Sequence, residues 1–490
     1  MPFTACFLPL LYNPSHFLIT LSSHSNQMAM PKLQVPLLFL FFFFFFFVFL
    51  ALTPSRAQTF GPPLVSPIQK DASTLQYIIT AYLQSPQETK LLLDLGASYI
   101  WINCDGYNSS SYRHIPCTTL LDEFVGCFAC LMNCRDSNPN CGDSVCVLKP
   151  ENPFQPSISG NEQYAPALVD YFSMLTLDNT GSIGGPSSSS PFTFIFSCGY
   201  KENLEGLARG VTGSAGLGRS SISIPVQASA IFHYPRYFAL CLSGSKTRPG
   251  AAFVGTKGPY KFGRGIDLSK PLAYTPLLLN PVGKYSYPDL KKPSSEYFIG
   301  VTSIKVNGKA LALNQSLLAI DSGNGSGGTK LSTVVPYTQL ETSIYKAVTV
   351  AFVKAAASSP FNLTATKPVQ PFSVCYPARN VRSTRAGPTV PAIDLVMHRN
   401  DVVWKILGSN SMVRVAEKGG ADVWCLGFVD AGVRPKTSIF SGDPSIVIGG
   451  YQMEDNFLQF DLESMRLGFS SSVLSRGTSC ASFRFAAKKG

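Results

Sequence analysis

Two aspartates in this sequence are followed by glycine-containing turns, an arrangement that can present a carboxylate for catalysis. Asp94 follows three leucines and precedes Gly96, and Asp321 follows an apolar pair and precedes Gly323. Two carboxylates that share one proton can act together on water, one as base and the other as acid. A single carboxylate cannot do this work, so the activity of the chain depends on whether a second one faces Asp94.

Predicted strands lead into both turns, and the pattern occurs twice. In the first half, residues 77–83 and 90–94 read as two strands joined by a turn. In the second half, residues 297–306 and 311–321 are divided by Asn307 and Gly308, a strong hairpin signal. The chain is therefore expected to contain a duplicated, β-rich plan.

Later segments of each half strengthen the duplication. Small and apolar residues that end in glycine occur at 214–218 and again at 445–450. We expect two similar lobes, an N-terminal one over residues 58–270 and a C-terminal one over 271–490. Helices are few, and residues 337–356 form the one amphipathic helix that apolar spacing predicts.

The N-terminal region reads as a targeting segment. Residues 35–53 are almost entirely apolar, and small residues surround the position after Ala57. This pattern predicts a signal peptide with its presegment over residues 1–57, and hence a secreted, extracellular or apoplastic protein with no membrane contact after cleavage. An uncleaved anchor is the alternative, because about 20 apolar residues can span a bilayer. Translation could begin at Met1, Met28 or Met30.

Cysteine usage also favours export. Twelve cysteines follow the presegment, an even number that suits six disulfides in an oxidising compartment, with the pairing left open. They are Cys104, Cys117, Cys127, Cys130, Cys134, Cys141, Cys146, Cys198, Cys241, Cys375, Cys425 and Cys480. A zinc site is the competing interpretation of the crowded cysteines, but His114 is the only imidazole nearby, so no metal or cofactor is expected. Sequons predict glycosylation at Asn108, Asn314, Asn324 and Asn362.

The chain is basic without a concentrated basic motif. Its net charge is +11, and loss of Lys32 and Arg56 on processing would leave +9. No reader motif or basic stripe for nucleic acid occurs, so nucleic-acid binding is not expected. A diffuse positive field favours acidic wall polymers or acidic proteins as partners.

Several motifs resemble a plant group of aspartic-peptidase-like proteins. The group comprises basic 7S globulins, extracellular dermal glycoproteins and inhibitors of fungal xylanases and xyloglucanases. The resemblance covers residues from about 63 to 485. The motifs are Trp101-Ile-Asn-Cys104-Asp105, Phe194-Ile-Phe-Ser-Cys198, Ala215-Gly-Leu-Gly-Arg219, Phe238-Ala-Leu-Cys241-Leu, Gly327-Gly-Thr-Lys-Leu-Ser332-Thr-Val-Val-Pro336-Tyr337 and Ile448-Gly-Gly-Tyr-Gln-Met-Glu454-Asp455-Asn.

The resemblance implies an all-β, bilobal, pepsin-like fold with few short helices and disulfide staples, in which proteolysis is absent or crippled. In the related peptidases the second Asp lies 13 residues before a helix-borne Tyr, and counting back from Tyr345 leads to Ser332. Asp321 is eleven residues too early and is kept only as the alternative partner of Asp94. Leu95 lacks the hydroxyl that would brace the pair, and residues 157–164 lack the peptidase flap turn. Asp94 is then a fold residue, and its pair with Ser332 is vestigial.

The group also implies a binding function in place of catalysis. Its inhibitory members place loops of the C-terminal lobe in the active site of a microbial glycoside hydrolase. Arg385 and Arg476 lie in Ser- and Gly-containing loops of this kind, and solvated arginines are the alternative interpretation. A guanidinium can pair bidentately with a catalytic carboxylate of such an enzyme.

One departure from the group bears on the target. Its xylanase inhibitors present a His before the last Cys, and no His occurs between Phe469 and Cys480. This favours inhibition of a xyloglucan-specific endoglucanase over a xylanase. A basic globulin that serves in storage or binds a small peptide is the first alternative, and an active aspartic endopeptidase is the second.

Overall fold

Most of the regular secondary structure in the computed structural model is β-strand. The structure describes residues 62–83, 87–115, 146–155, 165–178, 181–186, 193–283, 292–416, 420, 422–433 and 442–485. Residues 1–59 and 60–490 are two separate units. Three predicted features lie outside the described residues. They are the signal segment, the flap segment at residues 157–164, and the cysteines Cys117, Cys127, Cys130, Cys134 and Cys141.

The predicted hairpin of the first half is present. β2 (Tyr77–Leu83) pairs antiparallel with β3 (Gln87–Asp94), with Ile79 opposite Leu91. Every second residue of β2 is buried, so the strand turns one face to the core. The last four residues of β3 are all buried, and this strand carries Asp94 into the interior.

Each half then repeats one pairing scheme, which confirms the predicted duplication. In the first half β11 (Gly213–Gly216) runs parallel to β3 and antiparallel to β4 (Ile100–Asn103), and β4 runs parallel to β10 (Thr193–Gly199). In the second half β30 (Ile446–Ile448) runs parallel to β20 (Thr329–Leu331) and antiparallel to β21 (Thr338–Leu340). β21 in turn runs parallel to β29 (Phe428–Asp430). The fold is all-β and bilobal, as expected.

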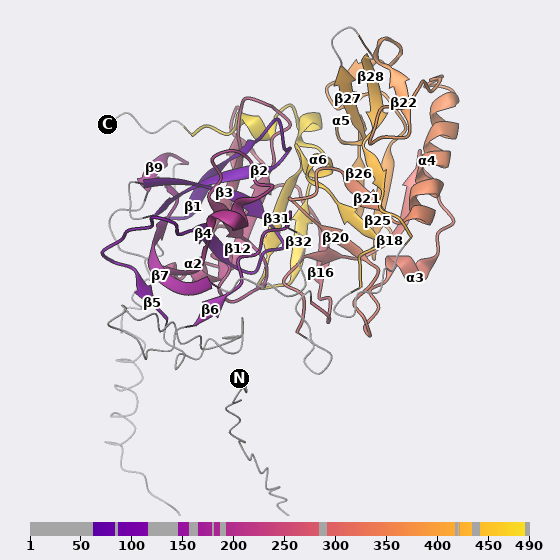
Figure 1. The fold of residues 1–490 in the computed structure, drawn as a ribbon. Helices are drawn as coiled ribbons and strands as arrows, with labels where there is room; N and C mark the ends of the chain where they lie inside the picture. The colour runs from indigo at the N-terminus through magenta and orange to yellow at the C-terminus, as the bar shows by residue number, and fades with distance from the viewer. Residues whose placement is uncertain are drawn as a thin grey trace, which may run out of the picture. The chain divides into compact units, whose positions relative to one another are not determined.

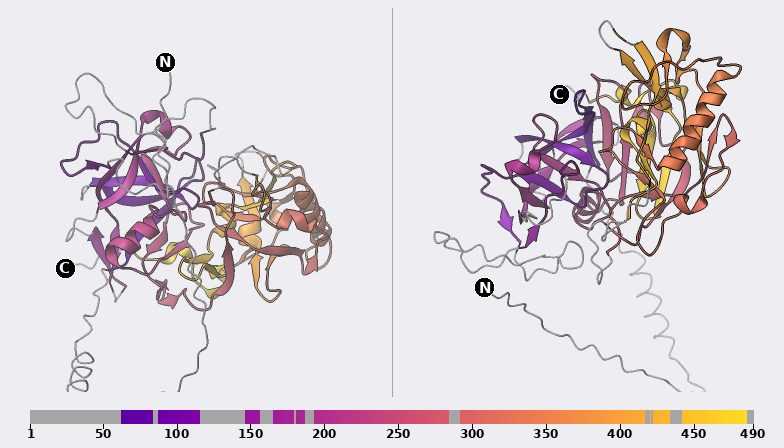
Figure 2. Two further views of the ribbon diagram at one scale, coloured as in Figure 1. Left: turned by 90° about the horizontal axis from the view of Figure 1, so that it is seen from below. Right: turned by 45° about the vertical axis from the view of Figure 1, so that its right-hand side comes forward.

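The two halves share a central sheet. β12 (Tyr237–Cys241) lies between β13 (Gly250–Val254) and β31 (Phe457–Asp461), and β32 (Arg466–Phe469) pairs with β16 (Ala273–Leu278). Phe238 and Phe460 stack across it with ring centroids 4.3 Å apart. The C-terminal strands therefore lie among strands of the chain's middle, as the yellow ribbons show in Figure 1 and from two further directions in Figure 2.

The remaining strands complete the two halves. In the first half they are β1 (Leu64–Lys70), β5 (Arg113–His114), β6 (Val147–Leu148), β7 (Ala165–Ser173), β8 (Leu175–Leu177), β9 (Ile183–Pro186), β14 (Lys261–Phe262) and β15 (Ile266–Asp267). In the second they are β17 (Phe298–Ile299), β18 (Val301–Val306), β19 (Lys309–Ala310), β22 (Cys375–Pro377), β23 (Ser383–Thr384), β24 (Gly387–Pro388), β25 (Ile393–Met397), β26 (Val403–Ile406), β27 (Met412–Ala416) and β28 (Asp422–Leu426).

The amphipathic helix is shorter than predicted. α4 (Thr342–Ala357) begins five residues after the predicted start because residues 338–340 form β21, which pairs with β29 and β30. Glu341 caps the helix, and its carboxylate accepts hydrogen bonds from the backbone N–H groups of Ser343 and Ile344. The other helical segments in the described part of the chain are short: α2 (Ile224–Phe232), α3 (Gln315–Leu318), α5 (Gly408–Ser411), α6 (Gly450–Met453), η1 (Lys201–Leu204), η2 (Ala378–Asn380), η3 (Val473–Arg476) and η4 (Cys480–Ser482).

A second prediction was wrong. Residues 311–321 do not form a strand, since they hold α3 and an exposed loop, and the strand that enters the second turn is β20. The hairpin at Asn307 and Gly308 is present, with both residues at positive φ, but its returning strand β19 has only two residues. The α3 segment is polar on its exposed side, and Asn314 caps it, so helical capping overrides the apolar alternation there.

Disulfides join Cys104 to Cys198, Cys241 to Cys480 and Cys375 to Cys425, and Cys146 is also disulfide-bonded. Among the described residues there is no helix long and apolar enough to cross a membrane. The same residues contain no group of three His, Cys, Asp or Glu side chains that could hold a metal ion.

Candidate functional site

The Asp94 carboxylate lies at the buried end of β3 and is bonded to its own turn. Its Oδ1 accepts a hydrogen bond of 2.7 Å from the N–H of Gly96, and the residue is 6% exposed. Its backbone carbonyl accepts a bond of 2.9 Å from the N–H of Leu217, beyond the parallel strand β11. These bonds are those of a residue that shapes the turn.

Ser332 occupies the corresponding position in the second half. It follows β20 directly, and its N–H donates to the carbonyl of Ile448 on β30. A Cβ atom on Gly216 would lie 2.4 Å from the carbonyl oxygen five residues after Asp94. A Cβ atom on Gly449 would lie 2.5 Å from the carbonyl carbon five residues after Ser332. Because the same close approach occurs at the same spacing, the two turns are equivalent, and the second carries a hydroxyl in place of a carboxylate.

The side chain of Thr333 joins the two turns. The hydroxyl of Thr333 donates to the carbonyl of Leu93 at 2.6 Å and accepts from the N–H of Leu95 at 3.1 Å. Leu95 has no hydroxyl with which to return the contact. The brace between the halves is therefore one-sided.

Asp321 lies in a different environment. It is exposed in the loop between α3 and β20, and its Oδ1 accepts from the N–H groups of Gly323 and Asn324 at 2.7 and 3.0 Å. Its own N–H donates to the carbonyl of Ser326. The carboxylate therefore serves its own surface loop.

An ion pair that the sequence did not reveal lies beside the Asp94 turn. Lys330 Nζ is 2.8 Å from Glu296 Oε1, and that oxygen would lie 3.3 Å from a Cβ atom on Gly96. The neighbouring Ser295 hydroxyl donates to the carbonyl of Gly96. Lys330 lies in the motif at residues 327–337, but Glu296 lies in none, and the strand pairing of β17 with β20 brings the two residues together.

The two arginine loops are neighbours in space. Arg385 lies at the turn between β23 and β24 and is exposed. Its Nη1 would lie 3.3 Å from a Cβ atom on Gly477, the residue after Arg476. Residues 91 positions apart in sequence are thus on one surface.

The two arginines differ in what they can reach. Arg476 is half-buried at the end of η3, and its Nη2 donates to the carbonyls of Asp267 and Lys270 at 2.7 and 2.6 Å. This side chain ties its loop to the first half of the chain. Arg385 is the one that lies exposed toward solvent.

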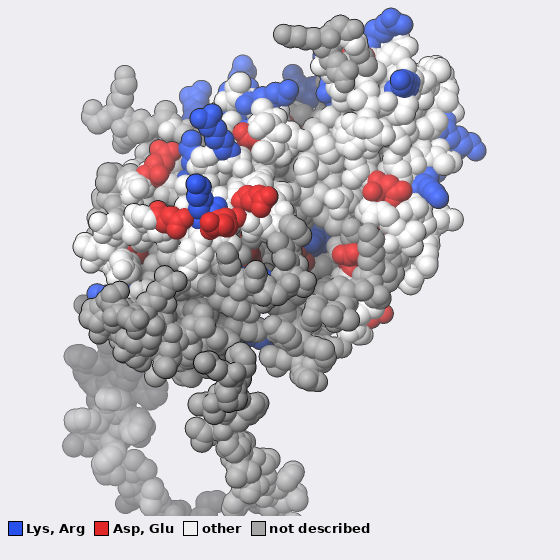
Figure 3. All heavy atoms as spheres, in the orientation of Figure 1, with Lys and Arg blue, Asp and Glu red and all other residues white. Residues whose placement is uncertain are grey.

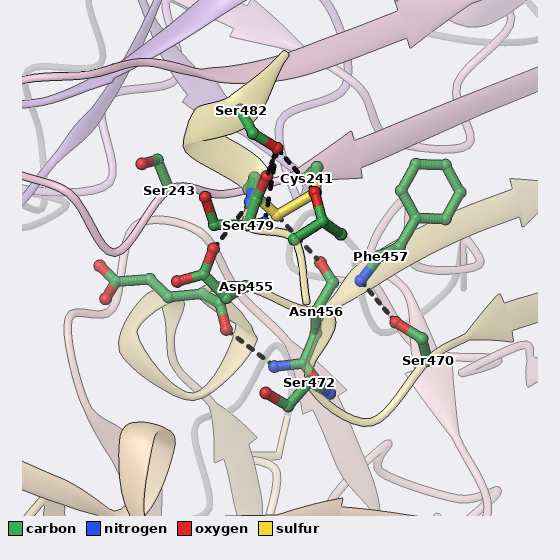
Figure 4. The surroundings of a disulfide bond; sticks show 12 residues. Cys241, Ser243, Asp455, Asn456, Phe457, Ser470, Ser472, Ser479 and Ser482 are labelled. Carbon is green, nitrogen blue, oxygen red and sulfur yellow. Dashed lines mark hydrogen bonds between the residues drawn. A yellow bond between two sulfur atoms is a disulfide. The ribbon is translucent and has the colours of Figure 1, made fainter. Parts of the chain in front are cut away.

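The loop of Arg476 is anchored at both ends by the segment before β31 (Figure 4). The carboxylate of Asp455 accepts from the N–H of Cys480 at 2.8 Å, and its carbonyl accepts from the N–H of Val473 at 2.7 Å. Asn456 Oδ1 accepts from the N–H of Ser472 at 3.0 Å, and Cys480 is disulfide-bonded to Cys241. Burial raises the pKa of Asp455. The loop is therefore held in one shape before any partner binds.

The predicted glycosylation sites all lie on the surface. Asn108, Asn314, Asn324 and Asn362 are exposed. The side-chain oxygen of Asn314 caps α3 by accepting from Ser316 N–H. Exposure makes each of the four amides accessible for modification.

Comparison with known proteins identifies the relatives of this arrangement. The family described as "Xylanase inhibitor N-terminal" matches residues 77–256, and "Xylanase inhibitor C-terminal" matches residues 296–471. The chain is 47% identical over 438 residues to "Probable aspartic proteinase GIP1" of Glycine max, covering 89% of this chain and 94% of that protein.

Solved structures of similar proteins have the same fold as this chain. The crystal structure of edgp has a TM-score of 0.78 at 44% identity and covers 88% of this chain and 100% of its own. The crystal structure of basic 7S globulin from soybean has a TM-score of 0.67 at 29% identity, with 86% and 98% covered. With both lobes matched in order and both equivalent turns present, the chain belongs to the xylanase-inhibitor family of aspartic-peptidase-like proteins.

Proposed function

We propose that this protein is a secreted, proteolytically inactive aspartic-peptidase homologue that binds and inhibits a microbial glycoside hydrolase. The observation that carries the proposal is the exposed Arg385 at a hairpin turn, supported by a loop that a disulfide and Asp455 hold in place. The description of the family as xylanase inhibitors supports a hydrolase as the kind of partner.

The chemistry of recognition follows from the enzyme's own mechanism. Glycoside hydrolases place two carboxyl groups on either side of the scissile bond. A guanidinium can form two parallel hydrogen bonds with one carboxylate, which gives both energy and orientation. Because the loop beside Arg385 is already ordered, less conformational entropy is lost on binding.

The specific target we propose is a xyloglucan-specific endoglucanase. The segment between Phe469 and Cys480 offers Arg476 but no His, and Arg476 is occupied by two backbone carbonyls. Arg385 then provides the direct contact, and Arg476 holds the loop that supports it.

Inhibition of a purified fungal xyloglucan-specific endoglucanase tests this proposal. We expect Arg385→Ala to raise the inhibition constant by about 30-fold or more, the size of an interface hot spot, without changing the melting temperature. Arg476→Ala should weaken inhibition and also lower the melting temperature, because two carbonyl contacts are lost. Arg399→Ala is the matched control, since Arg399 is exposed and pairs only with the neighbouring Asp401 among the described residues. Tight inhibition that survives the double substitution of Arg385 and Arg476 would remove both from the mechanism.

We also propose that proteolysis is absent, because Ser332 occupies the position where a second carboxylate is needed. A hydroxyl cannot share a carboxyl proton at working pH. Incubation with a denatured protein at acid pH should give no pepstatin-sensitive cleavage. Cleavage that is lost in Asp321→Asn would instead assign the second carboxylate to Asp321.

A basic globulin that serves in storage or binds a small peptide is the second candidate, and its support is the likeness to the soybean basic 7S globulin structure. Accumulation in seed bodies together with no inhibition across a panel of fungal glycoside hydrolases would favour it. The panel therefore separates the two candidates.

Secretion and glycosylation belong to the same proposal. Disulfides such as Cys104–Cys198 and Cys375–Cys425 form and persist in oxidising compartments. A mature N-terminus near residue 58 and a mass decrease on treatment with an N-glycosidase are the expected results.

A further inference from the structure

Four segments that meet around the Arg476 loop are strongly basic. They are residues 243–249, 261–270, 382–385 and 472–485, and together they carry nine basic residues and one acidic residue. We call this surface the basic face, and its basic residues are Lys246, Arg248, Lys261, Arg264, Lys270, Arg382, Arg385, Arg476 and Arg484.

Hydrogen bonds and close contacts bring three of these segments together. Gly263, between Lys261 and Arg264, donates its N–H to the carbonyl of Ser482. Arg476 binds the carbonyls of residues 267 and 270. Arg385 adjoins Gly477, as described above.

The segment of residues 243–249 is linked to the Arg476 loop by the disulfide between Cys241 and Cys480. Cys241 precedes the 243–249 turn directly, and a Cβ atom on Gly244 would lie 2.9 Å from Asp455 Oδ2. The charge of Arg248 acts on that same carboxylate. Residues from both halves of the chain therefore surround one loop.

The charges of this face are available to a partner. All nine basic residues are exposed except Arg476, which is half-buried. The single acidic residue, Asp267, already accepts bonds from the N–H groups of Tyr260 and Ser269 and from the Ser269 hydroxyl. Figure 3 shows Lys and Arg side chains along the upper edge of the molecule, where Figure 1 places the yellow C-terminal segment.

We propose that the basic face steers and orients an acidic protein, namely a glycoside hydrolase whose catalytic cleft is rimmed by Asp and Glu. Because this role presupposes the proposed inhibition, it specifies the partner further: hydrolases with a neutral or basic rim are excluded by the charge. The arrangement favours a protein over a linear polyuronate. The exposed Arg385 adjoins the anchored loop of residues 472–480 and is surrounded by further exposed basic residues, which matches the anatomy of an interface with an anchor and a charged rim. A flexible polymer does not require this arrangement.

Steering and anchoring act on different rate constants. Rim charges raise the association rate by long-range attraction, which salt screens over about 10 Å at 0.1 M. A buried, bidentate contact chiefly sets the dissociation rate. Substitutions at the other residues of the basic face should therefore change the association rate, whereas substitution of Arg385 should change the dissociation rate.

The test measures both rate constants with an acidic fungal xyloglucan-specific endoglucanase between low and moderate NaCl. We expect the association rate of the wild type to fall steeply with salt. Lys261→Glu combined with Arg264→Glu should lower it about tenfold at low salt and leave the dissociation rate within about twofold. The matched control is Lys346→Glu with Lys354→Glu on α4, which changes the net charge equally through two exposed residues away from the basic face. Arg385→Ala should chiefly raise the dissociation rate.

Four results would overturn the inference, and they are distinguishable. Inhibition with association rates that ignore salt and both charge reversals removes the steering role and leaves the proposed function intact. If the α4 control variant loses as much of its association rate, the net charge of the protein, and not the position of the basic face, determines the rate. Unchanged hydrolase association together with lost retention of the 261/264 variant on polygalacturonate assigns the face to a wall polymer. If no glycoside hydrolase is inhibited, the proposed function and the inference fall together.

Discussion

At the scale of single residues, the Thr333 hydroxyl forms hydrogen bonds between the two equivalent turns. Thr333 bonds to the backbone on both sides of Asp94, and all of these groups are buried. In an active dyad this brace would hold two carboxylates in register. Here it joins the turn of Asp94 to the turn of Ser332.

Thr333→Val should therefore destabilise the protein by about 1–3 kcal/mol, because a buried N–H and carbonyl lose their partner. The measurement is the urea midpoint of unfolding. Thr302→Val is the control, since its exposed hydroxyl donates to the carbonyl of Met397 at 2.9 Å and water can replace it. If both variants lost the same stability, the hydrogen bonds of Thr333 between the two turns would contribute no more than a hydrogen bond at the surface.

A second carboxylate can be introduced at the equivalent position. Ser332→Asp would place it opposite Asp94, and like charges at short distance raise the pKa of one of them. The folded state then holds a proton that the unfolded state releases at lower pH, so stability is present in acid and is lost as the pH rises through the raised pKa. We expect the melting temperature of this variant to fall from pH 4 to pH 7 relative to Ser332→Asn. A pH-independent difference would show that the two side chains do not face each other.

At the scale of elements, strands and short turns were largely predictable, and their lengths were not. Alternation predicted β2 and β3, and Asn307-Gly308 predicted a hairpin, because both signals are local. The start of α4 was misplaced because residues 338–340, Thr-Gln-Leu, carry no local signal that ends a strand there, and their pairing with β29 and β30 makes them a strand. The prediction of a strand over residues 311–321 failed because Asn314 caps the short helix α3 within that segment.

The site followed a similar division. Counting along the chain led to Ser332, whose turn is equivalent to that of Asp94, because spacing survives in a shared fold; the inhibitory role of Arg385 and Arg476 stays a prediction. Such counting could not predict that Arg476 would be tied to Asp267 and Lys270, or that Glu296 and Lys330 would lie beside Gly96. Those contacts join residues far apart in sequence and depend on the pairing of whole sheets.

Asp455, which anchors the Arg476 loop, should make the stability of the protein depend on pH. Burial raises the pKa of Asp455, so its contribution to stability is present at acid pH and is lost as the pH rises through the raised value. Asp455→Asn keeps the acceptor for Cys480 N–H and removes the charge. We expect the wild type to lose stability relative to this variant between about pH 4 and pH 7.

Thermal unfolding across that range gives the measurement. Asp401→Asn is the control of opposite sign, because a hydrogen bond from Arg399 lowers the pKa of Asp401, and stability from that pair is lost as the pH falls. If the wild type instead became more stable than the Asp455→Asn variant as the pH rises, the raised pKa of Asp455 would be contradicted.

At the scale of the whole molecule, the Cys241–Cys480 disulfide closes the chain over 239 residues. Cross-linking so long a loop restricts the unfolded state, and loss of a native disulfide typically costs about 2–5 kcal/mol. Cys241→Ser with Cys480→Ser should lower the unfolding free energy by about that amount. It should also weaken hydrolase inhibition, since the Arg476 loop loses an anchor.

Chemical denaturation and inhibition assays on the same variant separate these effects. Cys375→Ser with Cys425→Ser removes a disulfide away from that loop and serves as the comparison. Stability loss in both variants, with weakened inhibition in the first alone, is the expected pattern. Equal inhibition by the two would show that the anchor does not matter for binding.

The central sheet has a consequence for biosynthesis. β12 and β16 leave the ribosome long before β31 and β32, yet β31 and β32 are their hydrogen-bonding partners. Until residues 457–469 emerge, two apolar strands have open edges, which are templates for pairing with another chain. The nascent protein therefore cannot complete its middle until it has almost reached its end, and it would need protection by a chaperone for nearly half of its synthesis.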